Sequence, residues 1–117
     1  MPTLLVVDSD TNLREDVCSF FRSNGNQVQQ AKDYSSAIKL IEKEHFDVIL
    51  SDVKLPGGSI RDLVRHVRDK DFKTVVVVHS EIDTVQEGVR AVKEGAFGIL
   101  QKPFTLPELN FQIRKAL

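Results

Sequence analysis

The chain has 117 residues, which is the size of a single domain that can bury its own core. Its 16 basic and 17 acidic residues give a net charge of −1, which argues against nucleic-acid binding through a broadly basic face. The single cysteine, Cys18, excludes an internal disulfide, and no apolar run is long enough to cross a membrane. We therefore expect a cytoplasmic protein without a leader peptide, in which Cys18 is a small buried apolar residue.

Short apolar runs alternate along the chain with segments whose apolar residues recur at helical spacing. The runs predict buried strands, and the spaced segments predict helices. The predicted strands are residues 3–7, 27–31, 47–51, 74–79 and 97–101. The predicted helices are residues 11–24, 34–44, 60–69, 84–94 and 105–117.

The alternation of strands and helices predicts an α/β fold, a doubly wound parallel sheet covered by helices on both sides. The clearest strand contains the four valines at 75–78, which is typical of a strand buried on both faces. Asp10 or Thr11 can cap the first helix. In the fourth helix we expect Val85, Val89 and Val92 to face inward.

Charged residues follow three of the predicted strands. Asp8 and Asp52 come directly after the first and third strands, and Lys102 follows the fifth. Ligands bind at the carboxyl ends of the strands in such sheets, so these side chains predict a small phosphate-and-metal site. Two close carboxylates favour a raised pKa or a bound cation, and Mg²⁺ prefers carboxylate oxygens. The alternatives are a solvated loop acid for Asp52 and a helix-dipole charge for Asp8.

Two further residues lie at the end of the valine strand. The hydroxyl of Ser80 can donate to a phosphoryl oxygen, although a turn or cap role is the alternative. The ammonium of Lys102 can neutralise a phosphoryl group as a point charge. By strand alternation His79 points away from Ser80, and we interpret it as structural rather than as a proton-transfer group.

Taken in order, these residues resemble the receiver domain of two-component response regulators, and the resemblance covers essentially the whole chain. The matching segments are Val6-Val7-Asp8, Asp52 with Pro56-Gly57, Ser80 after the valine strand, and Gly95-Ala96-Phe97 leading to Lys102-Pro103-Phe104. The resemblance implies a flavodoxin-like three-layer sandwich of five helices and five parallel strands in the order 2-1-3-4-5.

The resemblance also implies a role for each matching residue. Asp52 would accept a phosphoryl group from a phosphohistidine of a sensor histidine kinase. Mg²⁺ would be held by Asp8, Asp52 and the backbone carbonyl of Lys54. Ser80 and Lys102 would contact the phosphoryl group, and the peptide before Pro103 would be cis. Such a domain is a phosphoacceptor switch with only self-phosphorylation and autodephosphorylation chemistry, so we do not expect a turnover enzyme.

The partners implied are a histidine kinase or phosphotransfer protein, and an output domain, effector protein or second copy of the domain. We expect residues 1–117 to be the N-terminal part of a longer protein, with no direct nucleic-acid contact. The segments 51–54 and 95–100 resemble receivers of sigma-54-dependent transcription activators. The output face would comprise the fourth helix, fifth strand and fifth helix, and would present Glu87, Arg90, Lys93, Glu94, Gln101 and Arg114.

Four features depart from the family pattern. One is Gly58-Ser59-Ile60, which stands where Met-Asp-Gly often follows Pro-Gly, and the other three are single residues. Ser9 stands where a second acid is usual, which should weaken Mg²⁺ binding unless Asp10 compensates. Glu81 replaces a small residue, and Ile99 replaces an aromatic switch residue. These departures leave open a second hypothesis, a degenerate receiver that binds proteins independently of phosphorylation.

A third hypothesis is an enzyme. The segment Asp8-Ser9-Asp10-Thr11 resembles the opening motif of haloacid-dehalogenase-type phosphatases. We disfavour it because that family needs a further acidic pair after a later strand, and this sequence supplies none.

Overall fold

The computed structural model describes residues 2–70 and 73–117. Within them, five parallel strands form one sheet in the order β2-β1-β3-β4-β5. The strands are β1 (Thr3–Val7), β2 (Gln27–Ala31), β3 (Val48–Asp52), β4 (Val75–Ser80) and β5 (Gly98–Gln101). The predicted fold class and strand order are confirmed.

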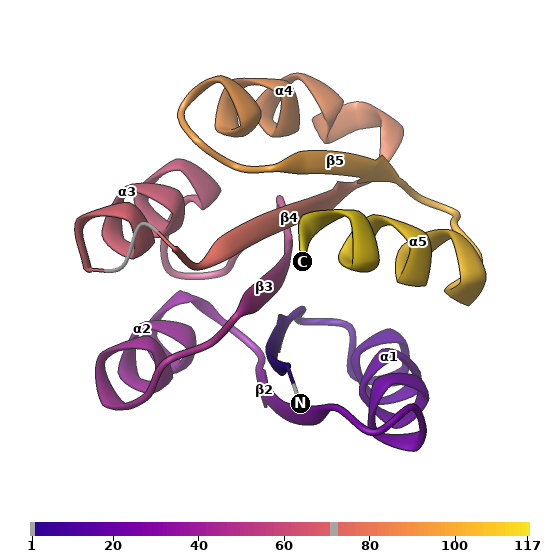
Figure 1. Ribbon diagram of the computed structural model, residues 1–117. Helices are drawn as coiled ribbons and strands as arrows, with labels where there is room; N and C mark the ends of the chain where they lie inside the picture. The colour runs from indigo at the N-terminus through magenta and orange to yellow at the C-terminus, as the bar shows by residue number, and fades with distance from the viewer. Residues whose placement is uncertain (1, 71–72) are drawn as a thin grey trace.

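Helices cover both faces of the sheet, as Figure 1 shows, with α1 and α5 on one side and α2 and α3 on the other. The helices are α1 (Thr11–Ser23), α2 (Tyr34–Lys43), α3 (Ile60–Lys70), α4 (Val85–Lys93) and α5 (Leu106–Ala116), with a short 3₁₀ helix η1 (Ile82–Thr84) before α4. Among the described residues, no helix has the length and apolarity needed to cross a membrane.

Two strands extend one residue further than predicted. β3 includes Asp52, which pairs with His79 of β4, and β4 includes Ser80, which pairs with Gln101 of β5. The site residues at these two strand ends therefore have backbones fixed by the sheet rather than free in loops.

Alternate residues of the central strands pack into two separate cores. Val6 and Leu50 pack with α1 and α5, whereas Val7 and Val78 pack with α2, α3 and α4. Cys18 is buried on the α1 side of the sheet, as predicted.

The predicted inner face of α4 is wrong at one position. Val89 is 39% exposed, and the helix buries Gly88 and Ala91 instead. The cause is Ile99 on β5, because a Cβ added to Gly88 would lie 2.1 Å from Cδ1 of Ile99. A residue without a side chain lets α4 approach the sheet closely at this point, and this approach turns Val89 outward.

A glycine closes α4 in a conformation that other residues rarely adopt. Gly95 has φ +126°, and an added Cβ would lie 2.2 Å from Nη1 of Arg68, which donates to the carbonyl of Glu94. Gly25 also has a positive φ, of +88°, but nothing lies within 4 Å of the position of its Cβ. An alanine at position 25 would therefore strain only the backbone, whereas an alanine at position 95 would also collide with Arg68.

We predict that Gly95→Ala lowers the free energy of unfolding by about 1–3 kcal/mol, since it combines a strained backbone with a clash against Arg68. Gly25→Ala is the matched control, and it should lower stability by less because only the backbone is strained. Urea unfolding followed by circular dichroism measures both. An equal loss in the two variants would show that the contact with Arg68 is unimportant.

Candidate functional site

The structure brings Asp8, Asp52 and Lys102 together at the carboxyl edge of the sheet. Nζ of Lys102 lies 3.1 Å from Oδ2 of Asp52 and 3.5 Å from Oδ2 of Asp8. Both carboxylates are buried, with Asp8 1% exposed and Asp52 6% exposed. One ammonium therefore faces two buried acids.

The remaining oxygen of each carboxylate accepts a backbone hydrogen bond. Oδ1 of Asp8 accepts from the amide of Asp10 at 2.9 Å, and Oδ1 of Asp52 accepts from the amide of Lys54 at 3.2 Å. These bonds fix both side chains in place, so that the two Oδ2 atoms point toward Lys102.

Burial and charge alter the proton affinities of this cluster. Burial raises the pKa of Asp8, and the nearby charge of Asp52 raises it further against the opposing amide of Asp10 and ammonium of Lys102. Burial alone would lower the pKa of Lys102, but the charges of Asp8 and Asp52 outweigh it and raise that pKa. Lys102 is accordingly a permanent cation near neutral pH.

Ser80 ends β4, beside the strand that carries Asp52, and is fully buried. Its Oγ has no hydrogen-bond partner among the described residues, whereas its carbonyl accepts from the amide of Lys102 at 2.7 Å. The Lys102–Pro103 peptide is cis. A buried hydroxyl without a partner is costly, by about 1–3 kcal/mol, and is available to a ligand at this edge.

The departures Ser9 and Glu81 are both exposed. Asp10, the acid nearest to Ser9, is the N-cap of α1 and accepts from the amide of Leu13 at 3.2 Å. Oδ1 of Asp10 is thus committed to the cap of α1, although the residue lines the same hollow as Lys102. Glu81 lies 3.8 Å from Nζ of Lys54, and this partner offsets part of its negative charge.

Sequence reasoning missed one member of the cluster. His79 is 2% exposed, and its Nε2 lies 3.5 Å from Oδ2 of Asp8. Burial, helped by the charge of Lys102, lowers the pKa of His79 to about 3, so the imidazole is neutral. The register pairs His79 with Asp52, so both side chains point to the same face of the sheet, and the pattern of a single strand does not carry this information.

One residue of the expected output face lies elsewhere. Glu94 turns toward α3, where it forms ion pairs with Arg61 and Arg65. Arg61 chiefly lowers the pKa of Glu94, to about 2. The prediction that Glu94 belongs to that face is therefore wrong, whereas Glu87, Arg90, Lys93, Gln101 and Arg114 are exposed as expected.

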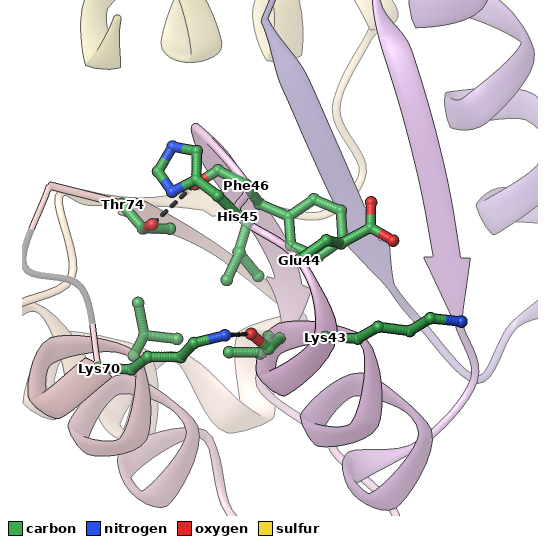
Figure 2. A pocket seen from close by; sticks show the side chains of 9 residues that line it. Lys43, Glu44, His45, Phe46, Lys70 and Thr74 are labelled. Atoms are coloured by element: carbon green, nitrogen blue, oxygen red, sulfur yellow. Dashed lines mark hydrogen bonds between the residues drawn. The ribbon is translucent and has the colours of Figure 1, made fainter.

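A hollow lies at the opposite edge of the sheet, between the C-terminal ends of α2 and α3 (Figure 2). Lys70 donates to the carbonyl of Ile41, and Thr74 donates to the carbonyl of Phe46 at 2.7 Å. These side chains satisfy backbone carbonyls near the C-terminus of α2, which is a common structural role for lysine. Lys70 and Thr74 therefore have structural roles at this hollow, which is separate from the acidic site.

Comparison with known proteins identifies the family. A family model described as the response regulator receiver domain matches residues 4–114. The chain belongs to this family. The crystal structure of a response regulator receiver domain protein from Clostridium thermocellum superposes on this receiver domain with a TM-score of 0.92 at 24% identity, covering 99% of this chain and 94% of that one.

Curated relatives of this receiver domain are longer proteins. The transcriptional activator protein PfeR of Pseudomonas aeruginosa is 35% identical over 109 residues, which cover 93% of this chain and 35% of PfeR. The regulatory protein AtoC of Escherichia coli is 30% identical over 114 residues, which cover 97% of this chain and 25% of AtoC. The chain thus spans about a third or a quarter of these relatives.

We predict that Asp8→Asn stabilises the fold at neutral pH. The pKa of Asp8 is raised in the folded state, so its ionisation opposes folding above that pKa and has no effect below the unfolded value of about 3.9. The gain in unfolding free energy should therefore be larger at pH 7 than at pH 4, as measured by urea unfolding. The same change at the exposed Asp16 is the control, and a gain at Asp8 that does not vary with pH would contradict the account.

Proposed function

We propose that this receiver domain accepts a phosphoryl group on Asp52, in the cytoplasm, from a sensor histidine kinase or phosphotransfer protein. The observation that supports it best is the single ammonium of Lys102 between two buried carboxylates, beside a buried hydroxyl without a partner. One ammonium does not balance the charge of two carboxylates, so the cluster attracts further positive charge. The hydroxyl of Ser80 can donate a hydrogen bond to a bound phosphoryl group.

The reaction follows from the charges of these residues. An oxygen of Asp52 attacks phosphorus in line, a P–O bond forms, the P–N bond of the phosphohistidine breaks, and the imidazole leaves and takes up a proton. Lys102 neutralises charge on the transferring group, and the hydroxyl of Ser80 donates to a phosphoryl oxygen. The product is an acyl phosphate on Asp52 that lasts until water hydrolyses it.

The residues present fit a divalent cation. Oδ2 of Asp8 is buried and accepts no hydrogen bond among the described residues, and the ammonium of Lys102 faces it only at 3.5 Å, so this oxygen can also take an ion. Asp8, Asp52 and the backbone carbonyl of Lys54 would hold Mg²⁺, which prefers such oxygen ligands. When bound, Mg²⁺ would supply positive charge to the transferring phosphoryl group. With Ser9 exposed and Asp10 engaged in capping, we expect this binding to be weak.

The output is the control of a further domain or partner protein. PfeR and AtoC are named as a transcriptional activator and a regulatory protein, which supports transcription as the regulated process for this chain as well. Segments 51–54 and 95–100 favour an output of the sigma-54-dependent type. We infer that phosphorylation draws Ser80 toward the acyl phosphate and repacks η1 and α4, and that the face of α4, β5 and α5 then contacts the output domain or a second copy.

We predict one added phosphoryl group after incubation with acetyl phosphate and Mg²⁺, as measured by intact-mass spectrometry. The adduct should be absent in Asp52→Asn and present in Asp69→Asn, which makes the same change on the C-terminal part of α3. A chelator should also abolish it, because the cluster then lacks the positive charge that the reaction requires.

Two results would count against this proposal. An adduct that survives in Asp52→Asn would place the phosphoacceptor elsewhere. Folded protein without any adduct, at high Mg²⁺ as well, would favour the degenerate receiver that binds partners independently of phosphorylation.

A further inference from the structure

The imidazole of His79 belongs to the same cluster as the two acids. Asp8, Asp52 and His79 each offer one ligand atom, and these atoms all lie within 4.8 Å of one another. His79 is 2% exposed, and its Nε2 faces Oδ2 of Asp8 at 3.5 Å. The three residues come from the ends of three neighbouring strands, so the sheet itself holds them in place.

This histidine is poorly explained by packing alone. Its Nδ1 has no hydrogen-bond partner among the described residues, and Oδ2 of Asp8 has none either. The edge-on contact of its ring with Phe104, at 5.7 Å between centroids, is one that an apolar side chain could also make. A further valine after Val78 would fill the same position without burying polar atoms. The other ring nitrogen, Nε2, lies 3.5 Å from Oδ2 of Asp8, which is long for a hydrogen bond, so the acid and the imidazole satisfy each other poorly and both can serve a ligand.

We propose that His79 completes a mixed nitrogen–oxygen site with Asp8 and Asp52 that binds a divalent first-row transition metal in preference to Mg²⁺. Imidazole nitrogen suits cobalt, nickel and zinc far better than it suits magnesium, whereas carboxylates accept either kind of ion. The inference rests on the proposed function in one respect, which is that these two carboxylates hold a divalent cation.

The charges of the cluster favour the binding of an ion that forms strong bonds to nitrogen. Two carboxylates and the ammonium of Lys102 leave one net negative charge, and Lys102 already contacts both Oδ2 atoms. An incoming ion must compete with that ammonium. Ser9 brings no charge to help, so a hard ion such as Mg²⁺ has little advantage. A nitrogen ligand strengthens the binding of only those ions that have a high affinity for imidazole, and His79 supplies that nitrogen.

The remaining two histidines could bind the same metals at the surface. Nε2 of His66 faces Oε1 of Glu42, and Nε2 of His45 lies 3.2 Å from Oδ1 of Asp47. Both are much more exposed than His79. A reference protein with His45→Gln and His66→Gln therefore removes these competing sites and leaves a single imidazole.

The test is a calorimetric titration of the reference protein with MnCl₂, CoCl₂ and MgCl₂, without any phosphodonor. We expect Co²⁺ to bind at least about tenfold more tightly than Mg²⁺, with Mn²⁺ between them. In the same background His79→Val should weaken Co²⁺ binding by about 10- to 100-fold and leave Mg²⁺ binding within about twofold. His79→Gln is a second variant of similar size in case valine disturbs the fold. Equal Co²⁺ affinity with and without His79 would overturn the inference.

A spectroscopic signature identifies the ligand directly. Electron spin-echo modulation of bound Mn²⁺ should show a coupling to a nitrogen nucleus in the reference protein. The modulation frequency should change when the histidines are labelled with ¹⁵N. The coupling should vanish in His79→Val. Its absence in the reference protein would show that the imidazole stays off the metal, and would also overturn the inference.

These readouts separate the inference from the proposed function, because neither involves phosphoryl transfer. A nitrogen coupling in a protein that forms no adduct on Asp52 would support the metal site and count against the phosphoacceptor. If the protein forms the adduct in Mg²⁺ but binds Co²⁺ equally well with and without His79, the phosphoacceptor is supported and the metal site is contradicted.

Discussion

The repulsion between two buried carboxylates is the constraint on which this structure depends. Asp8 and Asp52 end adjacent strands of the sheet, and backbone amides fix one oxygen of each, so neither side chain can turn away to solvent. Lys102 is the cation that allows both acids to remain at this edge. Burial and, to a smaller extent, the charge of Asp52 raise the pKa of Asp8 even though the ammonium of Lys102 lowers it, so one ammonium compensates only in part. A fold that keeps such a pair is less stable than one without it. The excess negative charge attracts cations, and with them the phosphoryl groups that the cations accompany.

Much of this arrangement could be predicted from the sequence because strand ends and strand order place residues without any knowledge of side-chain packing. The apolar runs ending at Asp8 and Asp52 were enough to place both acids at one edge. The inner face of α4 could not be predicted in the same way. Helical spacing favoured Val89 as a buried residue, but the close approach of Ile99 to Gly88 decides which side faces the sheet, and that contact joins two elements. Glu94 was misplaced for the same reason, since its partners Arg61 and Arg65 belong to α3.

His79 illustrates a different limit of sequence reasoning. Alternation along β4 correctly separates it from Ser80, yet alternation within one strand does not say what lies on either side. The pairing of His79 with Asp52 across the ladder supplies that information, and it depends on the register between strands. This pairing places one imidazole nitrogen among the oxygens of the two acids, within 4.8 Å of them.

The central claim is that the ammonium of Lys102 favours the charged form of the buried Asp8, and ¹³C-detected NMR titration of its carboxyl group tests it most directly. In Lys102→Met the pKa of Asp8 should rise further above its ordinary value, because the charge that lowers it is gone. Lys54→Met removes an ammonium that pairs with Glu81 and Asp83 at the surface, and it should leave the pKa of Asp8 unchanged. An Asp8 that titrates identically in the wild type and in Lys102→Met would contradict the account.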